Sequence, residues 1–306
     1  MSEAEGMNKL RPDVVHEGAG APSGYKRPLS GNGEVSLLVG PMGDMTAGPD
    51  GSAGPPIFRA GRRYGSQRRF ELISYGFYDI AVEVDGKPLG KMLAWEQTLD
   101  LARGRIVCRS RHAGGIEVRT DVLTPLGWDA LLVRRSVVTR SHVRVEQRMA
   151  YVFSSDPDGT EPPPGVRLLS TASGRRGSRL LYEAAGQSDF VGCVLLCAPR
   201  ASSAGSKGCR LVSAVSGQAL PGSPAEACWL IAFGDSCHRP GEVPTDAAAL
   251  AAAGDRVDGL ARHFLDVGFD GVAGESAAEW GRYWAESAVD IPDAAIQRMY
   301  RTAQYH

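Results

Sequence analysis

The sequence predicts a mainly β protein, a large antiparallel sandwich of two sheets followed by a short helical segment. Between residues 34 and 236, apolar and polar residues alternate in short runs that return about every ten residues, as in an antiparallel sandwich. After residue 241 the alternation stops, and alanine-rich stretches with apolar residues three or four apart replace it. A block of strands followed by a block of helices is the order of an α+β chain, not of alternating βαβ units.

The N-terminal residues are polar, rich in Gly and Pro and without periodicity, which predicts a flexible arm over residues 1–30. The first predicted strand follows in SGNGEVSLLVGPMG, residues 30–43, where glycines flank Asn32. Glycine lets a backbone approach a ligand closely, and an Asn amide both donates and accepts hydrogen bonds, so Asn32 is a candidate substrate-binding residue. A tight turn that starts a strand is the alternative, because the context of a phosphate-binding loop is absent.

The alternation of apolar and polar residues is clearest between residues 78 and 153. In GIEVRTDVLT, Ile116 and Val118 point to one face of the strand and Glu117 points to the other. The dipeptides Asp85-Gly86 and Gly114-Gly115 fit the tight turns between antiparallel strands. The strands predicted up to this point are 34–40, 78–84, 92–99, 105–111, 115–124, 130–139 and 142–153.

A proline-rich loop, SSDPDGTEPPPGV at residues 154–166, interrupts the strands without separating two domains, because strands resume after it. Cys193 and Cys197 share one face of a later, buried strand at a separation of about 13 Å, which excludes a disulfide between them. We therefore predict one sandwich domain over residues 31–240. The strands predicted after the loop are 166–170, 179–184, 189–199, 209–215 and 227–236.

Residues 241–290 are predicted to form a helical linker of two helices. Thr245 or Asp246 is placed to cap the first helix. The second helix, GESAAEWGRYWAES, puts Trp280 and Trp284 on one face, where they anchor it against the sandwich or the next domain. The predicted apolar face of the first helix consists of Leu260, Phe264 and Val267.

A third helix begins at Asp293, which is placed as an N-cap. No Gly or Asn closes this helix before the sequence ends. Residues 291–306 are therefore predicted to be the start of a longer helical domain, with an apolar stripe that has no partner in this chain. The stripe consists of Ile296, Met299, Tyr300 and Ala303.

The composition limits the classes of partner. Lys and Arg number 34 against 35 Asp and Glu, so the formal net charge of −1 gives no electrostatic reason to expect nucleic acid or a membrane as partner. No apolar run approaches the ~20 residues of a membrane-spanning helix, and no apolar signal segment opens the chain, so we expect a cytoplasmic location. The six cysteines lack metal-ligand spacing, and neither a metal nor a cofactor is expected.

Signatures of catalysis are missing, because the sequence has no His pair at metal-ligand spacing and no G-x-S-x-G elbow. We therefore assign no catalytic residue. Trp95 lies in an alternating strand and either stacks on a sugar ring or fills the core, which makes it the second candidate substrate-binding residue. The clustered carboxylates mostly occupy polar phases of strands, where solvated faces are expected: Asp79, Glu83, Asp85, Glu96, Asp100, Glu117 and Asp121.

Two stretches together resemble a known family. Residues 80–138, IAVEVDGKPLGKMLAWEQTLDLARGRIVCRSRHAGGIEVRTDVLTPLGWDALLVRRSVV, resemble the N-terminal β-sandwich of glycoside hydrolase family 65 and its relatives. The GNG at residues 31–33 is similar to the glycine-rich entry strand of these sandwiches. The closing pattern is similar to the linker and first barrel helix of six-hairpin glycosidases, and consists here of Trp280, Trp284, Ile291, Pro292, Asp293, Ile296, Tyr300 and Tyr305.

The resemblance implies a galactose-mutarotase-like supersandwich, a short helical linker and the first helix of an (α/α)6 barrel. It implies that the chain is the non-catalytic N-terminal part of a glycoside hydrolase or glycoside phosphorylase acting on oligosaccharides, inactive alone, with a homodimer as a possible assembly. Two alternatives stay open. One is a stand-alone carbohydrate-binding sandwich, and the other is an aldose-epimerase-like enzyme with His112 or His142 as its base.

Overall fold

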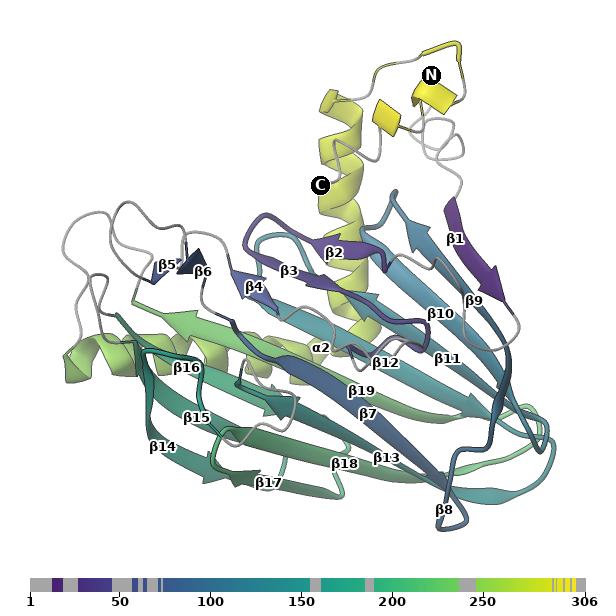
Figure 1. The fold of residues 1–306 in the computed structure, drawn as a ribbon, viewed down its shortest axis with the longest axis horizontal. Coiled ribbons are helices and arrows are strands. Elements are labelled where there is room, and N and C mark those ends of the chain that lie inside the picture. The colour runs from purple at the N-terminus through teal and green to yellow at the C-terminus, as the bar shows by residue number, and fades with distance from the viewer. Residues whose placement is uncertain are drawn as a thin grey trace.

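Within the described residues, the computed structural model is an antiparallel β sandwich with one long, kinked helix (Figure 1). Most of the predicted N-terminal arm, residues 155–160 of the proline-rich loop, Cys237 and the final segment 301–306 lie outside the described residues. The structure describes residues 13–18, 27–45, 57–59, 63–64, 71–72, 74–154, 161–184, 190–236, 246–287, 289, 291–293, 295–297 and 299–300.

The larger sheet has nine strands in the order β1-β9-β10-β11-β12-β19-β16-β15-β14. Strands β9 to β12 follow one another along the chain, and each pairs with the next in antiparallel register. The turn between β10 and β11 contains Gly114 and Gly115 at φ of 83° and 71°, a left-handed conformation that glycine adopts without strain. In sheet order the strands are Asp13–Gly18, Met92–Asp100, Arg105–His112, Ile116–Leu123, Ala130–Val138, Ala225–Asp235, Phe190–Cys197, Gly177–Ala184 and Val166–Ser173.

The second sheet has five strands in the order β17-β18-β13-β7-β8, and two small sheets complete the β structure. Its strands are Ser203–Lys207, Arg210–Ala219, Val143–Val152, Phe77–Val84 and Lys87–Pro88. A three-stranded sheet consists of β2 (Leu29–Gly31), β3 (Val35–Leu38) and β4 (Phe58–Arg59). A two-stranded sheet consists of β5 (Arg63–Tyr64) and β6 (Glu71–Leu72).

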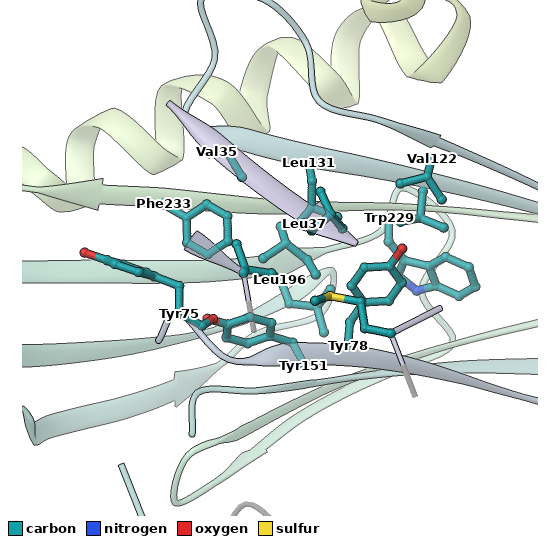
Figure 2. Packing of buried hydrophobic residues seen from close by; sticks show 14 of the residues in the cluster. Val35, Leu37, Tyr75, Tyr78, Val122, Leu131, Tyr151, Leu196, Trp229 and Phe233 are labelled. Carbon is teal, nitrogen blue, oxygen red and sulfur yellow. The ribbon is translucent and has the colours of Figure 1, made fainter. Parts of the chain in front are cut away.

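The main core lies between the inner faces of the two large sheets (Figure 2). Tyr78 and Tyr151 from the five-stranded sheet meet Trp229 and Leu131 from the nine-stranded sheet, and all four are fully buried. β3 adds Val35 and its neighbours at one side of this core. Burying each such side chain contributes about 1.5–3 kcal/mol, so the two sheets are held together mainly by apolar contact.

The helix α2, Ala247–Ser287, lies on the outer face of the nine-stranded sheet and breaks at Gly268, where φ is 71° and ψ is −177°. Figure 1 shows its two limbs running in different directions. The Asp246 carboxylate accepts the Ala249 amide N–H at 2.8 Å, which confirms Asp246 as a cap. Phe264 is fully buried against the sheet, but Val267, one residue before the break, is 41% exposed, so its predicted place on the same packed face as Phe264 is wrong.

The second limb of α2 is anchored by its tryptophans, as predicted. Trp280 and Trp284 are buried and stack with ring centroids 6.0 Å apart. The Trp284 indole N–H donates to the Leu101 carbonyl at 2.9 Å. Gly104 lies in the turn between β9 and β10, with φ of 59°. A Cβ atom at this position would overlap the Trp280 indole nitrogen. No helix of the described residues has the length and apolar character that crossing a bilayer requires.

Each strand predicted from the sequence is confirmed within a few residues, but short ones were missed. Residues 13–18, expected to belong to a flexible arm, instead form β1 beside β9. Asp293 is confirmed as an N-cap, since its carboxylate accepts the Ala295 and Ile296 amides at 2.8 and 3.0 Å. Ile296 and Met299 are 54% and 72% exposed, as predicted for the apolar stripe. The domain boundaries at 30, 240 and 290 stay predictions.

Candidate functional site

A group of charged side chains occupies one end of the outer face of the nine-stranded sheet. Strand register places Glu96, Arg109 and Arg119 in one row across β9, β10 and β11. Arg111 and Glu117 lie opposite each other in the next row. Side chains alternate between faces along a strand, so these all point away from the core. They line an open concavity of about 800 Å³, which we call the charged trough.

The arginines of the charged trough differ in their partners. Arg109 pairs with Glu96 at 2.7 Å, with both side chains largely exposed. Arg119 donates two hydrogen bonds to Asp121, at 2.9 and 3.1 Å. Arg111 and Glu117 form no ion pair with each other or with any other residue in the part of the chain that the structure describes. This pair is therefore available to a ligand.

Beside the trough, farther along the same face of the sheet, lie Asp121 and Asp100, which are almost fully buried. The alternating pattern predicted solvated positions for both, and this is wrong. Asp121 pairs with Arg119, and lies 3.7 Å from Arg105 and 3.5 Å from Arg134. A buried carboxylate is stable only when such partners surround it, and the pattern identifies the face of a strand without showing what covers it.

Arg134 connects the trough to the helix. Its guanidinium lies 4.4 Å from the Phe269 ring centroid and 2.7 Å from Asp270, both directly after the break in α2. Burial lowers the pKa of Arg134, but the carboxylates of Asp121 and Asp270 raise it more, so the net shift is upward and the cation is retained. Arg134 thus marks the boundary between the part of the sheet face under α2 and the open part.

Asn32 lies at the turn between β2 and β3, where its amide bonds within the protein. Its amide nitrogen donates to the carbonyls of Pro125 and Trp128 at 2.6 and 2.8 Å. Its amide oxygen accepts the backbone N–H groups of Glu34 and Val35 at 2.9 and 2.7 Å. These contacts fasten the turn to the loop between β11 and β12. A substrate-binding role for Asn32 stays a prediction.

Trp95 is only 4% exposed and belongs to the strand that floors the charged trough. Its register partner on β10 is Ser110, which points toward the sandwich interior. The strand therefore places Trp95 under the trough, and sugar stacking by its indole stays a prediction. Asn32 belongs to the turn between β2 and β3, whereas Trp95 belongs to β9.

A buried ionic network lies at the other end of the sandwich. Arg59 of β4 is 1% exposed and pairs with Asp235 and, at 2.8 Å, with Asp129. Burial lowers the pKa of Arg59, while Asp235, Tyr75 and Asp129 raise it to a net upward shift. The guanidinium also lies 5.2 Å from the Tyr75 ring centroid. This network joins β4 to β19, and we assign it a structural role.

The two sandwich histidines have different environments. His112 points inward and is 3% exposed, with its ring nitrogens 2.9 Å from Ser110 Oγ and the Gly90 carbonyl. Burial lowers the pKa of His112 below its ordinary 6.5. His142 is exposed and contacts Gln218 at 3.0 Å. Neither contacts a carboxylate in the described residues, so they lack the acid partner that an aldose-epimerase mechanism needs.

Sequence reasoning missed the charged trough, although its signal was present. Glu96 and Glu117 were expected on a solvated polar phase, but strand register was needed to bring Arg111 opposite Glu117. Likewise, only the structure shows that Asn32 reaches residues 125 and 128. Across the described residues, no group of three or more His, Cys, Asp or Glu is arranged to hold a metal ion.

Comparison with known proteins finds likeness in structure and none in sequence. No protein-family model matches the chain, and no curated protein matches it either. A solved structure described as a kojibiose phosphorylase from the human microbiome matches all of this chain with a TM-score of 0.69 and 8% identity. The match covers 40% of that protein, so this chain spans less than half its length.

Two further solved structures match less closely. A galactose mutarotase related enzyme from Lactobacillus acidophilus has a TM-score of 0.36 over 72% of this chain, at 10% identity and with 100% of that protein covered. A bacterial glucoamylase complexed with acarbose has a TM-score of 0.38 over 89% of this chain, at 9% identity and with 40% covered. At these scores neither supports an argument. The first match shows the fold, a large antiparallel sandwich followed by a helical segment.

Proposed function

We propose that this chain is the N-terminal, non-catalytic part of a carbohydrate-active enzyme, a glycoside hydrolase or glycoside phosphorylase that acts on oligosaccharides. The observation that carries the proposal is the match of the whole chain to a protein described as a kojibiose phosphorylase, at a TM-score of 0.69. The absence of an acid–base pair around His112 and His142 among the described residues supports a non-catalytic role for the sandwich.

The C-terminal elements fit a supporting role. The Trp280 and Trp284 side chains fix the second limb of α2 to the sandwich. Beyond it, Asp293 caps a helical turn whose Ile296 and Met299 remain exposed. We propose that residues 291–306 begin an (α/α)6 barrel and that these apolar side chains pack against further helices of that barrel. On this proposal the catalytic groups belong to the barrel.

The test is an activity comparison. The purified 306-residue chain, incubated with kojibiose, maltose or trehalose with and without inorganic phosphate, should release neither glucose nor glucose 1-phosphate. A longer product of the same reading frame should turn over one of the three. Turnover by the 306-residue chain itself, retained through a second purification step, overturns the non-catalytic assignment. A homodimer stays a prediction, which light scattering of the same sample tests.

A further inference from the structure

The charged trough has the dimensions of a ligand site. Its volume of about 800 Å³ falls within the range of roughly 300–1,000 Å³ that small-molecule sites occupy. Its lining combines arginines and glutamates with the small apolar side chains of Ala94 and Val138. Val138 is 36% exposed, so an apolar surface remains open inside a polar rim. A ligand with hydroxyl groups and an apolar C–H face fits this combination.

The lining of the trough mixes charges of both signs, with three arginines and two glutamates, and this mixture bears on the class of ligand. Arg109 pairs with Glu96, and Arg119 pairs with the buried Asp121, a carboxylate that it shares with Arg105 and Arg134. The remaining pair, Arg111 and Glu117, is one cation opposite one anion. A polyanion would meet carboxylates in both rows of the trough, and a cation would meet arginines in both. The trough therefore favours a ligand that both donates and accepts hydrogen bonds over one that carries a strong net charge.

Arg111 and Glu117 offer complementary hydrogen-bonding groups at one place. Register partners on antiparallel strands have Cα atoms about 4.5–5.5 Å apart, so the two side chains leave the sheet side by side. The guanidinium only donates hydrogen bonds and the carboxylate only accepts them. A hydroxyl group does both, so two neighbouring hydroxyls accept from Arg111 and donate to Glu117 at the same time.

We propose that the charged trough binds a neutral oligosaccharide, with a vicinal diol of one sugar bridging Arg111 and Glu117. The apolar face of the ring contacts Val138. The inference rests on the proposed function for its class of ligand, but it concerns residues of this chain alone. A second copy of the chain fits the trough less well, because a two-fold interface puts the same patch on both subunits and two concave patches enclose a void.

The test is calorimetric titration of the 306-residue chain with kojibiose and with maltotetraose, and with trigalacturonate as an anionic comparison. Arg111→Gln and Glu117→Gln should each raise the Kd for the neutral sugars about tenfold, the usual loss for one hydrogen bond to a charged group. The double variant should lose less than the product of the two factors, since both residues hold one diol. Unfolding midpoints should stay unchanged, because both side chains are exposed.

Matched controls come from the same sheet. Arg167 and Glu183 are register partners on β14 and β15, and they pair at 2.6 Å on the surface. Arg167→Gln and Glu183→Gln should leave sugar binding as it is in the wild type.

Several outcomes overturn the inference: no heat with either neutral sugar, unchanged affinity in both trough variants, tighter binding of trigalacturonate, or a dimer that Arg111→Gln dissociates. Failure of the proposed function is a separate result. Trough-dependent sugar binding, with no glycoside turnover by the longer reading-frame product, would contradict only the enzyme assignment. Turnover by that product without sugar binding in the trough would contradict only this inference.

Discussion

The outer face of the nine-stranded sheet has two halves that share strands but differ in chemistry. Under α2, β12, β16 and β19 present Leu132, Leu195 and Leu230, which pack against Phe264 and Val272. Farther from the helix, β9 to β12 present the arginines and glutamates of the charged trough. The comparison indicates that a strand carries apolar residues on its outer face where the helix covers it and charged residues where the face is open, whatever its position in the sheet.

β12 crosses the boundary between the halves. Its first four residues, ALLV, are all buried, whereas RRSVV alternates between buried and more exposed positions. The strand β16 packs against α2, and its eight residues are all buried. A change from a continuous apolar run to strict alternation within one strand therefore marks where the helix stops covering the sheet.

The largest expected effect is in the covered half. Phe264→Ala should lower the free energy of unfolding by about 3–5 kcal/mol, because it opens a cavity between α2 and the sheet. Val138→Ala in the open half should change it by less than about 0.5 kcal/mol. Urea titrations followed by circular dichroism measure both. Equal losses for the two variants would show that the halves do not differ in packing.

The next effect concerns the turn that joins the edge of the sandwich to the start of β12. Asn32→Ala should cost about 1–3 kcal/mol, because it leaves the carbonyls of Pro125 and Trp128 without their donor. Sugar affinity in the trough should not change. Gln218→Ala, which removes an exposed contact to His142, serves as the control in the same denaturation assay. A loss of sugar affinity with unchanged stability would instead support Asn32 as a binding residue.

A smaller effect is expected from the paired charges of the open half. Arg109→Ala should lower stability by less than about 1 kcal/mol, since its ion pair with Glu96 is exposed. The difference between wild type and variant should vanish in about 1 M NaCl, where exposed charges are screened. A loss that persists in high salt would mean that Arg109 contributes through packing, and the open half would then resemble the covered one.

The smallest expected effect is on the pH dependence of protein stability, through the side chain of His112. Burial lowers its pKa in the folded state below 6.5, so the unfolded chain binds the proton more readily. The stability contributed by the neutral ring is present above pH 6.5 and is lost as the pH falls toward the folded-state pKa. Unfolding midpoints between about pH 8 and about pH 5 should show a smaller acid loss in His112→Asn than in the wild type. His142→Asn should retain the full loss, and identical curves for all three proteins would contradict the assignment.

The sequence predicted most of the fold because alternation, turns and caps are local signals. The Asp85-Gly86 turn and the Asp246 cap are examples in which a few neighbouring residues determine the structure. The site was harder to predict, because it depends on contacts between distant residues. Asp121 appeared solvated in its strand pattern, yet Arg105 and Arg134 on neighbouring strands make its burial possible. The strand β4 has only two residues, too few to show a period, and the six residues of β1, DVVHEG, do not alternate between apolar and polar.

The most direct test of the account is hydrogen–deuterium exchange of the 306-residue chain with and without saturating kojibiose. The account predicts slower exchange in peptides from residues 109–119, which form the charged trough, and unchanged exchange in residues 247–264 of α2. Two results would contradict the assignment of the open half of the sheet as the sugar-binding surface. One is protection from exchange that is confined to residues 30–33 and 125–128. The other is binding of kojibiose without any protection of residues 109–119.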